Sequence, residues 1–265
     1  MDLAQHFLEE SQDLDTLIRH LSDEDLEQVT AFKSWHISTV IRHLHFWNQM
    51  ALYALQDGAR FKQAIAPAMN AMQSGATLAG YEATALPVSG SELVALWRET
   101  YGIVAEAYAS ADPAQRCTWA GPSMSARSCI TARQMETWAH GQEVYDCLGG
   151  TRVNTDRLLN VVVLGINTYG WTFQVRGEDV PELKPYVELR APSGELWQFG
   201  EPQGENRITG DAEAFAQVVT QTRNVADTRL VCEGSIAERW MQNAQCFYGG
   251  PTEPPAPGTR QKRAS

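Results

Sequence analysis

Apolar residues at helical spacing dominate the first 150 positions, and this pattern constrains the fold more than any other feature. Segments 2–20 and 36–56 each place apolar side chains three or four residues apart, which is typical of amphipathic helices. Two more helices are predicted over 89–109 and 123–149, where serines can cap the first turns and glycines follow the last helix. Residues 58–88 are rich in Ala and Met with Gly and Pro breaks, so we expect an irregular or short-helix connection. Four helices with one long connection predict a helical bundle.

The second half of the sequence has a different pattern. After a further predicted helix, short runs of β-forming residues alternate with turns rich in Pro, Gly and Asp. The predicted helices are 154–168, 211–222 and 234–245, and the predicted strands are 171–176, 186–191, 195–200 and 228–232. We therefore predict an α+β chain with a helical bundle over 1–152 and a smaller α/β domain over 153–250 that starts with a linking helix. Residues 251–265 are Pro-rich and basic, and are predicted to form a mobile tail.

The charge balance limits the classes of partner. A net charge of −11 argues against a nucleic-acid or anionic-membrane surface, because both partners need a basic face. No apolar run is long enough to span a bilayer, and the opening residues lack the pattern of a secretory signal. The five cysteines are widely spaced without a CxxC pair, which is typical of reduced thiols. We therefore expect a cytoplasmic protein that binds neither nucleic acid nor membrane.

The stretch RQMETWAHGQEVYD (133–146) places several ionisable residues in one helical stripe. Glu136, His140 and Glu143 follow one another at spacings of four and three, so they share a helix face. One interpretation is a solvated face on which Arg133 pairs with Glu136 or Glu143. The other is a metal site, because a Glu and a His one turn apart supply two adjacent ligands from one rigid helix. A third ligand must then come from another element, and the spacing alone leaves both interpretations open.

The predicted helix 36–56 offers three histidines for that third ligand. His36 and His43 flank one side of its apolar stripe, and His45 flanks the other side. Each of them taken singly is more often an interfacial or core histidine than a ligand. The spacing favours His43 only slightly.

The segment WAGPSMSARSCITARQMETWAHGQEVYD (119–146) resembles the signature of the metal-binding proteins related to mycothiol-dependent maleylpyruvate isomerase, within the DinB-like superfamily. In that family a histidine from one bundle helix joins a Glu-x-x-x-His pair on the last bundle helix. The resemblance extends to STVIRHLHFW, and it implies that His43, Glu136 and His140 are the metal ligands. An acidic residue three positions after the second histidine is also usual, and Glu143 stands there. The resemblance implies that Glu143 orients the site, with a role as general base as the alternative.

The resemblance continues into the second half of the chain. RITGDAEAFAQVVTQTR and DTRLVCEGSIAERWMQNAQCFYGGP are similar to the sterol-carrier-like α/β domain of the family, so a DinB-like four-helix bundle followed by that domain is implied. Arg223 stands where the maleylpyruvate isomerases carry a functional arginine, and a guanidinium suits an organic carboxylate. A surface arginine near a helix end is the alternative. We expect a pocket between the domains, with metal ligands from the first and Arg223 from the second.

Three protein ligands leave open positions on a metal, which is the arrangement of a catalytic site. The resemblance implies an isomerase or thiol transferase that acts on a small organic acid or electrophile through a metal-activated nucleophile. Zn²⁺ is the expected ion, Fe²⁺ and Ni²⁺ are the alternatives, and a low-molecular-weight thiol is a candidate cosubstrate. A metal-dependent hydrolase or lyase, or a non-catalytic small-ligand-binding module, remains open. The hydrolase alternative follows from the amide hydrolysis carried out by other members of the superfamily. The binding module is suggested by LLNVVVLGINTYGW, which differs from relatives that carry His and Arg there; the residues in their place are Asn160, Val163, Asn167 and Tyr169.

Overall fold

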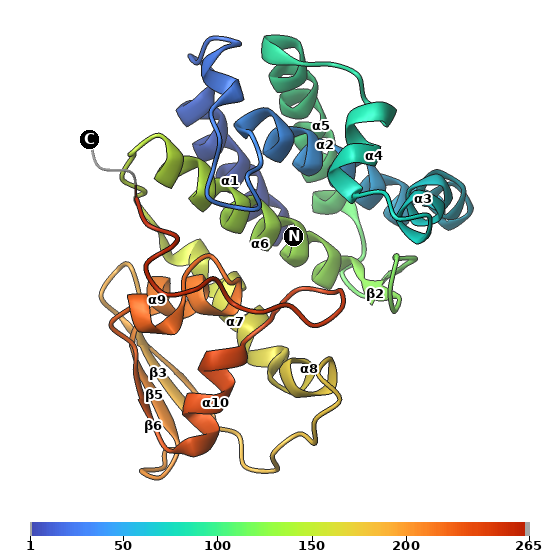
Figure 1. Ribbon diagram of the computed structural model, residues 1–265. Helices are drawn as coiled ribbons and strands as arrows, with labels where there is room; N and C mark the ends of the chain where they lie inside the picture. Colours follow the sequence, from blue (N-terminus) through green and yellow to red (C-terminus); the bar gives the residue numbers. More distant parts are fainter. Residues whose placement is uncertain (1, 263–265) are drawn as a thin grey trace. The chain divides into compact units, whose positions relative to one another are not determined.

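The structure is a computed structural model that describes residues 2–262. It divides into two compact units, Met1–Cys147 and Leu148–Ser265, each of which is treated by itself. The first unit is helical apart from one small hairpin, and the second combines helices with a four-stranded sheet (Figure 1). The predicted α+β class is therefore confirmed.

Four long helices form the centre of the first unit (Figure 1). They are α1 (Asp2–Ile18), α2 (Ile37–Gln56), α5 (Gly90–Ser110) and α6 (Ala126–Cys147). Helices α1 and α2 each pack against both α5 and α6, so the four helices enclose one core. The core is filled by large apolar side chains with almost no exposure, among them Phe7, Leu14, Ile41, Trp97 and Trp138. The helices lie close to the four predicted ranges.

The connection between α2 and α5 is more helical than the sequence indicates. It forms α3 (Gly58–Gln73) and α4 (Leu78–Ala85). The Asp57 side chain begins α3 by accepting hydrogen bonds from two backbone N–H groups of its first turn, and the Thr77 hydroxyl begins α4 by accepting one from the Gly80 N–H. Pro67 lies inside α3 without ending it. Helix α4 contacts α2, and this contact brings a residue of the connection to the candidate site described below.

Short elements complete the first unit. A 3₁₀ helix, η1 (Asp25–Glu27), follows α1, and a two-stranded antiparallel hairpin precedes α6. The hairpin consists of β1 (Arg116–Cys117) and β2 (Met124–Ser125). The Ser125 hydroxyl accepts a hydrogen bond from the backbone N–H of Ser128, which fixes where α6 begins.

The second unit contains a sheet with strand order β4-β3-β5-β6 and helices packed against it. Strand β3 runs antiparallel to β4 and parallel to β5, and β5 runs antiparallel to β6. The strands are β3 (Tyr186–Arg190), β4 (Leu196–Phe199), β5 (Arg207–Asp211) and β6 (Val231–Glu233). The helices are η2 (Asp156–Leu158), α7 (Leu159–Asn167), α8 (Tyr169–Gln174), α9 (Ala212–Val219), η3 (Val225–Asp227) and α10 (Ser235–Asn243). Helix α9 contacts both central strands, β3 and β5.

One prediction about the second half is wrong, and one strand of the sheet was not predicted. The predicted strand 171–176 lies mostly in α8, where the ring of Tyr169 packs edge-on against the rings of Phe173 and Trp240. Tertiary packing of these rings overrides the β propensity of the segment. Strand β5 was not predicted, because its five residues include Gly210 and Asp211, which are rare in strands.

The end of the described chain lies against the second unit. Pro255 O accepts a hydrogen bond from the Asn224 side chain, and the Gly258 N–H donates to the Asp227 carboxylate. Mobility of the predicted tail stays a prediction, and residues 263–265 lie outside the described part.

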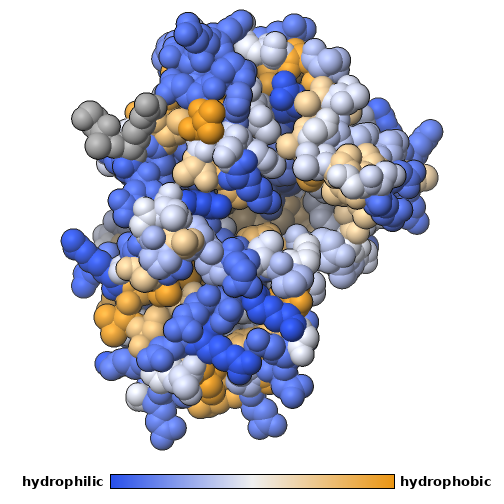
Figure 2. Space-filling model, viewed as in Figure 1, coloured by the Kyte–Doolittle hydropathy of each residue, from blue (hydrophilic) through white to orange (hydrophobic). Residues whose placement is uncertain are grey.

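The described helices and the surface drawn in Figure 2 show how apolar residues are distributed. None of the helices among residues 2–262 is long and apolar enough to cross a bilayer. On the face drawn in Figure 2, hydrophilic residues cover most of both units and hydrophobic residues form smaller patches.

Candidate metal centre

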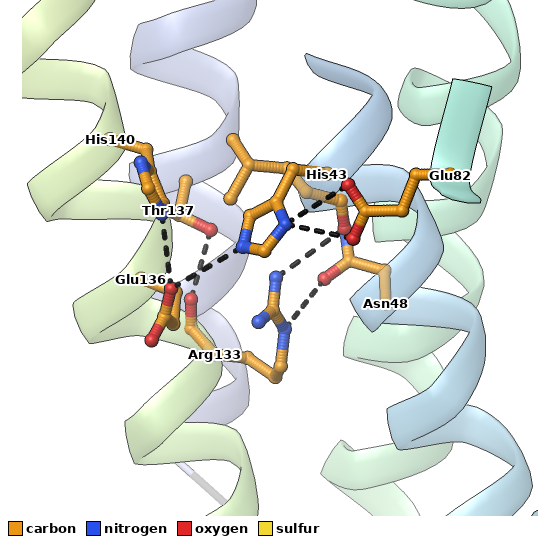
Figure 3. Close-up of polar contacts among 8 residues, drawn as sticks. His43, Asn48, Glu82, Arg133, Glu136, Thr137 and His140 are labelled. Carbon is orange, nitrogen blue, oxygen red and sulfur yellow. Dashed lines mark hydrogen bonds and ion pairs between the residues drawn. The ribbon is translucent and has the colours of Figure 1, made fainter. Parts of the chain in front are cut away.

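Three side chains from two helices converge inside the first unit (Figure 3). His43 comes from α2, and Glu136 and His140 come from α6. The Glu136 Oε2 atom lies 3.3 Å from His140 Nε2 and 3.9 Å from His43 Nε2. One ligand atom from each residue lies within 4.8 Å of the others, which is a separation that one metal ion can bridge. The structure thus brings together the three residues predicted as ligands.

A fourth residue, Glu82 on α4, contacts the His43 ring on the side opposite to Glu136 (Figure 3). His43 Nδ1 lies 2.9 Å from Glu82 Oε1 and 3.2 Å from Oε2, and the Glu82 residue is 1% exposed. A proton on Nδ1 leaves Nε2 unprotonated in the neutral ring, and Nε2 is the atom that faces Glu136. Metal-ligating histidines commonly donate their other N–H to a carboxylate in this way. Glu82 could not be predicted from the sequence, because no spacing rule links it to His43.

The electrostatics of Glu136 and His140 fit a ligand set, whereas the carboxylates beside His43 raise its pKa and favour its charged form. Burial opposes a charge on His43, but the carboxylates of Glu136 and Glu82 outweigh it and raise the pKa of His43. Burial also disfavours the charged form of Glu136, but contacts with His140 and His43 hold its pKa well below the usual range. Burial lowers the pKa of His140 despite the neighbouring Glu136. An ionised carboxylate beside a neutral imidazole supplies the two donor types that Zn²⁺ binds.

Aromatic rings surround the two histidines. The Trp35 ring stacks on His140 with centroids 5.8 Å apart, and it lies 5.2 Å from the His43 ring. Phe32 meets His140 edge-on at 5.0 Å. Lys33 and Ser34, which separate the two aromatics, both have positive φ angles of 50° and 55°, so the backbone turns sharply between the rings. This turn places two apolar rings over one side of the site.

Glu136 is the most exposed residue of the cluster. Its side chain is 26% exposed, whereas the side chains of His43 and His140 are 10% and 11% exposed. Solvent therefore contacts the cluster mainly at the carboxylate.

The interpretation of the charged stripe as a solvated face is wrong. Arg133, His140 and Glu143 are all buried, at 2%, 8% and 1% exposure. Arg133 donates hydrogen bonds to Asn48 and to the backbone oxygen of Leu44, both on α2. The stripe faces the core because α6 is covered by α1 on one side and α2 on the other.

The remaining candidate residues take different positions. His36 is bound to Glu27 near the surface, and His45 is buried with a pKa that burial lowers. Glu143 is buried one turn beyond His140, outside the cluster of three. Arg223 follows α9 in the second unit, and its Nη1 donates to the backbone oxygen of Thr222. The functional roles of Glu143 and Arg223 stay predictions.

The fold and the buried cluster define an α+β protein with a two-histidine, one-carboxylate site built from two helices of its helical unit. Residues 7–145 match the family model described as the mycothiol maleylpyruvate isomerase N-terminal domain. The matched residues include all three members of the cluster and make up more than half of the chain. The chain belongs to the mycothiol maleylpyruvate isomerase family.

Individual proteins are similar over most of the length. Two curated proteins of Mycobacterium tuberculosis, Uncharacterized protein MT0041 of strain CDC 1551 and Uncharacterized protein Rv0036c of strain H37Rv, are each 39% identical over 246 residues. The aligned region covers 91% of this chain and 93% of each relative. The crystal structure of the mycothiol-dependent maleylpyruvate isomerase matches with a TM-score of 0.46 and 15% identity, over 82% of this chain and 85% of that one. The crystal structure of a histidine-to-alanine mutant of that isomerase matches with a TM-score of 0.48 and 14% identity, again over 82% of this chain and 85% of that one.

Proposed function

We propose that this protein is a cytoplasmic metal-dependent enzyme that binds Zn²⁺ through His43, Glu136 and His140. The observation that carries this proposal is the hydrogen bond between His43 Nδ1 and Glu82, together with the Nε2 atoms of both histidines beside the Glu136 carboxylate. A buried acid that fixes the far nitrogen of a histidine is the usual support of a metal ligand. Fe²⁺ and Ni²⁺ are the alternative ions, since the same donor set accepts them.

A bound divalent ion with open positions lowers the pKa of a bound nucleophile and polarises an oxygen of the substrate. The chain's own residues would prepare that chemistry. Glu82 orients His43, and Phe32 and Trp35 exclude water from one side of the site. We assign Glu143 a role in holding His140 in place, because it is buried one turn further along α6.

The reaction that fits this site is an isomerisation or thiol transfer on a small organic acid or electrophile. Family membership supports it, since the family model is named for a mycothiol-dependent isomerase. A low-molecular-weight thiol is the proposed nucleophile. We assign recognition of the substrate carboxylate to Arg223, whose guanidinium can bind a carboxylate through two hydrogen bonds. This assignment treats the first unit as a DinB-like four-helix bundle and the second as a sterol-carrier-like domain.

Elemental analysis of the purified protein and of three variants tests the metal site. The variants His43→Ala, Glu136→Ala and His140→Ala should each lose most of the metal. His36→Ala is the control, because His36 is a histidine that directly precedes the same helix, α2, but is bound to Glu27 near the surface. Full metal retention in all three site variants would overturn the proposed site.

The reaction class is tested on the metal-loaded protein. Low-molecular-weight thiols and small unsaturated acids are first screened by thermal shift, and each ligand found is then assayed for turnover. Isomerisation or thiol addition that is lost in His140→Ala supports the proposal. Hydrolysis of an ester or amide would favour the hydrolase alternative, and binding without turnover would favour the binding module.

A further inference from the structure

A buried arginine lies one turn before Glu136 on α6. Arg133 is 2% exposed, and burial lowers the pKa of its guanidinium. Its Nε donates to Asn48 Oδ1 at 3.0 Å, and its Nη2 donates to the Leu44 backbone oxygen at 3.4 Å (Figure 3). Within residues 2–262, neither of these hydrogen-bond acceptors is a carboxylate. The Glu136 and Glu82 carboxylates are near enough to attract the guanidinium, but burial outweighs them and lowers its pKa, so burying the arginine here is costly.

The two acceptors lie on the helix that carries His43. Leu44 is the next residue after His43, and Asn48 lies one turn further along α2. Figure 3 shows the Arg133 side chain crossing from α6 to α2 beside the His43–Glu136 contact. The guanidinium and the candidate metal site therefore join the same two helices about one turn apart.

Asn48 is committed to this contact. It is 0% exposed, its Oδ1 accepts the Arg133 hydrogen bond, and its Nδ2 has no hydrogen-bond partner among the described residues. An unsatisfied buried N–H destabilises the folded state. Asn48 thus accepts the Arg133 hydrogen bond in a position that lowers the stability of the folded state.

We propose that Arg133 is a positioning residue of the metal centre: through Asn48 and Leu44 it sets the separation of α2 and α6, and with it the distance between His43 Nε2 and Glu136 Oε2. This inference rests on the proposed metal site. The planar guanidinium holds two acceptors in fixed directions, which a lysine ammonium cannot do in the same way.

Electrostatics and positioning predict opposite effects of removing the arginine. The guanidinium is close enough to Glu136 for the two charges to interact. If its charge were all that mattered, Arg133→Met would strengthen the binding of a divalent cation, because a nearby positive charge would be gone. If Arg133 positions the ligands, the same variant should bind zinc more weakly.

The experiment measures the zinc Kd by competition with a chromophoric chelator and the melting temperature of the metal-free protein. Arg133→Met and Asn48→Leu should each weaken zinc binding by about tenfold or more, the usual effect of removing a residue that supports a ligand. Arg133→Lys should fall between Arg133→Met and the unsubstituted protein. Asn48→Asp keeps the acceptor and removes the unsatisfied N–H, so it should retain the affinity. Substituting Co²⁺ should give an altered absorption spectrum in Arg133→Met.

The matched control is Arg98→Met. Arg98 on α5 binds Asp15 on α1 through Nε and Nη2, so it also joins two helices of the first unit. This control should lower the melting temperature and leave the zinc Kd within about twofold, because neither helix carries a ligand. Zinc binding as tight as in the unsubstituted protein, or tighter, in both Arg133→Met and Asn48→Leu would overturn the positioning role. If Arg133→Met does not fold, the zinc Kd values of Asn48→Leu and Arg133→Lys test the positioning role instead. Absence of zinc binding in the unsubstituted protein would instead overturn the proposed function itself.

Discussion

The Glu82 carboxylate accepts a hydrogen bond from His43 Nδ1 at 2.9 Å, across 39 positions of sequence. The contact ties the short helix α4 to the candidate metal centre and fixes which ring nitrogen faces Glu136. Glu82→Ala should therefore weaken zinc binding by about 10–100-fold, as for other residues that orient a metal ligand. Glu82→Gln keeps an acceptor oxygen and should therefore weaken zinc binding less than Glu82→Ala does. Calorimetric titration with zinc measures both variants, with the exposed acid Glu106→Gln as control; equal affinities throughout would show that Glu82 does not support the site.

Zinc should stabilise the first unit by linkage. A ligand that binds only the folded state at about 1,000 times its Kd adds about 4.1 kcal/mol to the free energy of unfolding. Thermal unfolding of the metal-free protein should shift to higher temperature when zinc is added, and His43→Ala should not show the shift. His36→Ala should behave as the unsubstituted protein. An equal shift in His43→Ala would mean that zinc binds elsewhere.

The three residues of the candidate metal site could be predicted from the sequence, whereas the residue that supports His43 could not. Glu136 and His140 are one turn apart on a strongly predicted helix, and His43 follows from the family resemblance. Glu82 lies in LAGYEATA, where apolar residues do not repeat at helical spacing, so a short helix was expected in this connection but neither its bounds nor its buried face was evident. The contact between α4 and α2 depends on tertiary packing, which no local pattern encodes.

The errors in the second half have a related cause. Residues 171–176 contain Trp, Thr, Phe and Val, which favour strands, but Phe173 is buried against Tyr169 from one turn earlier in α8. Strand β5 is short and contains a glycine with a positive φ of 147°, Gly210. It pairs with β3 and β6 on its two sides, so its position in the sheet comes from neighbours distant in sequence.

The packing of α7 on α9 predicts a substitution that the second unit will not tolerate. A Cβ added at Gly165 would lie 2.8 Å from Val219 Cγ2 and 3.1 Å from Phe215 Cε1. Gly165→Ala should therefore destabilise the second unit by about 1–3 kcal/mol through overpacking. Gly102→Ala on α5 is the matched control, since its Cβ would meet nothing within 4 Å, and it should stabilise the protein by about 0.5–1 kcal/mol. Denaturant unfolding measures both, and a neutral Gly165→Ala would contradict the close approach of the two helices.

Tyr108 joins three helices of the first unit. Its hydroxyl donates to the backbone oxygen of Ala51 on α2 at 2.9 Å, and it lies 3.0 Å from Cys129 Sγ on α6. Because the ring is fully buried, Tyr108→Phe should lower the free energy of unfolding by about 0.5–1.5 kcal/mol. Tyr53→Phe removes a hydroxyl that accepts a hydrogen bond from the exposed Arg60. This control should change the free energy of unfolding by less than about 0.5 kcal/mol. Urea titrations compare the two, and equal losses would mean that the Tyr108 contacts add nothing specific.

One divalent ion should bind between α2 and α6. Crystals grown with zinc and measured at the zinc absorption edge locate that ion. The proposed site should give one strong anomalous peak about 2.0–2.2 Å from His43 Nε2, His140 Nε2 and a Glu136 carboxylate oxygen. A zinc-saturated crystal with no anomalous peak at these three atoms, or with the peak at other residues, would contradict it.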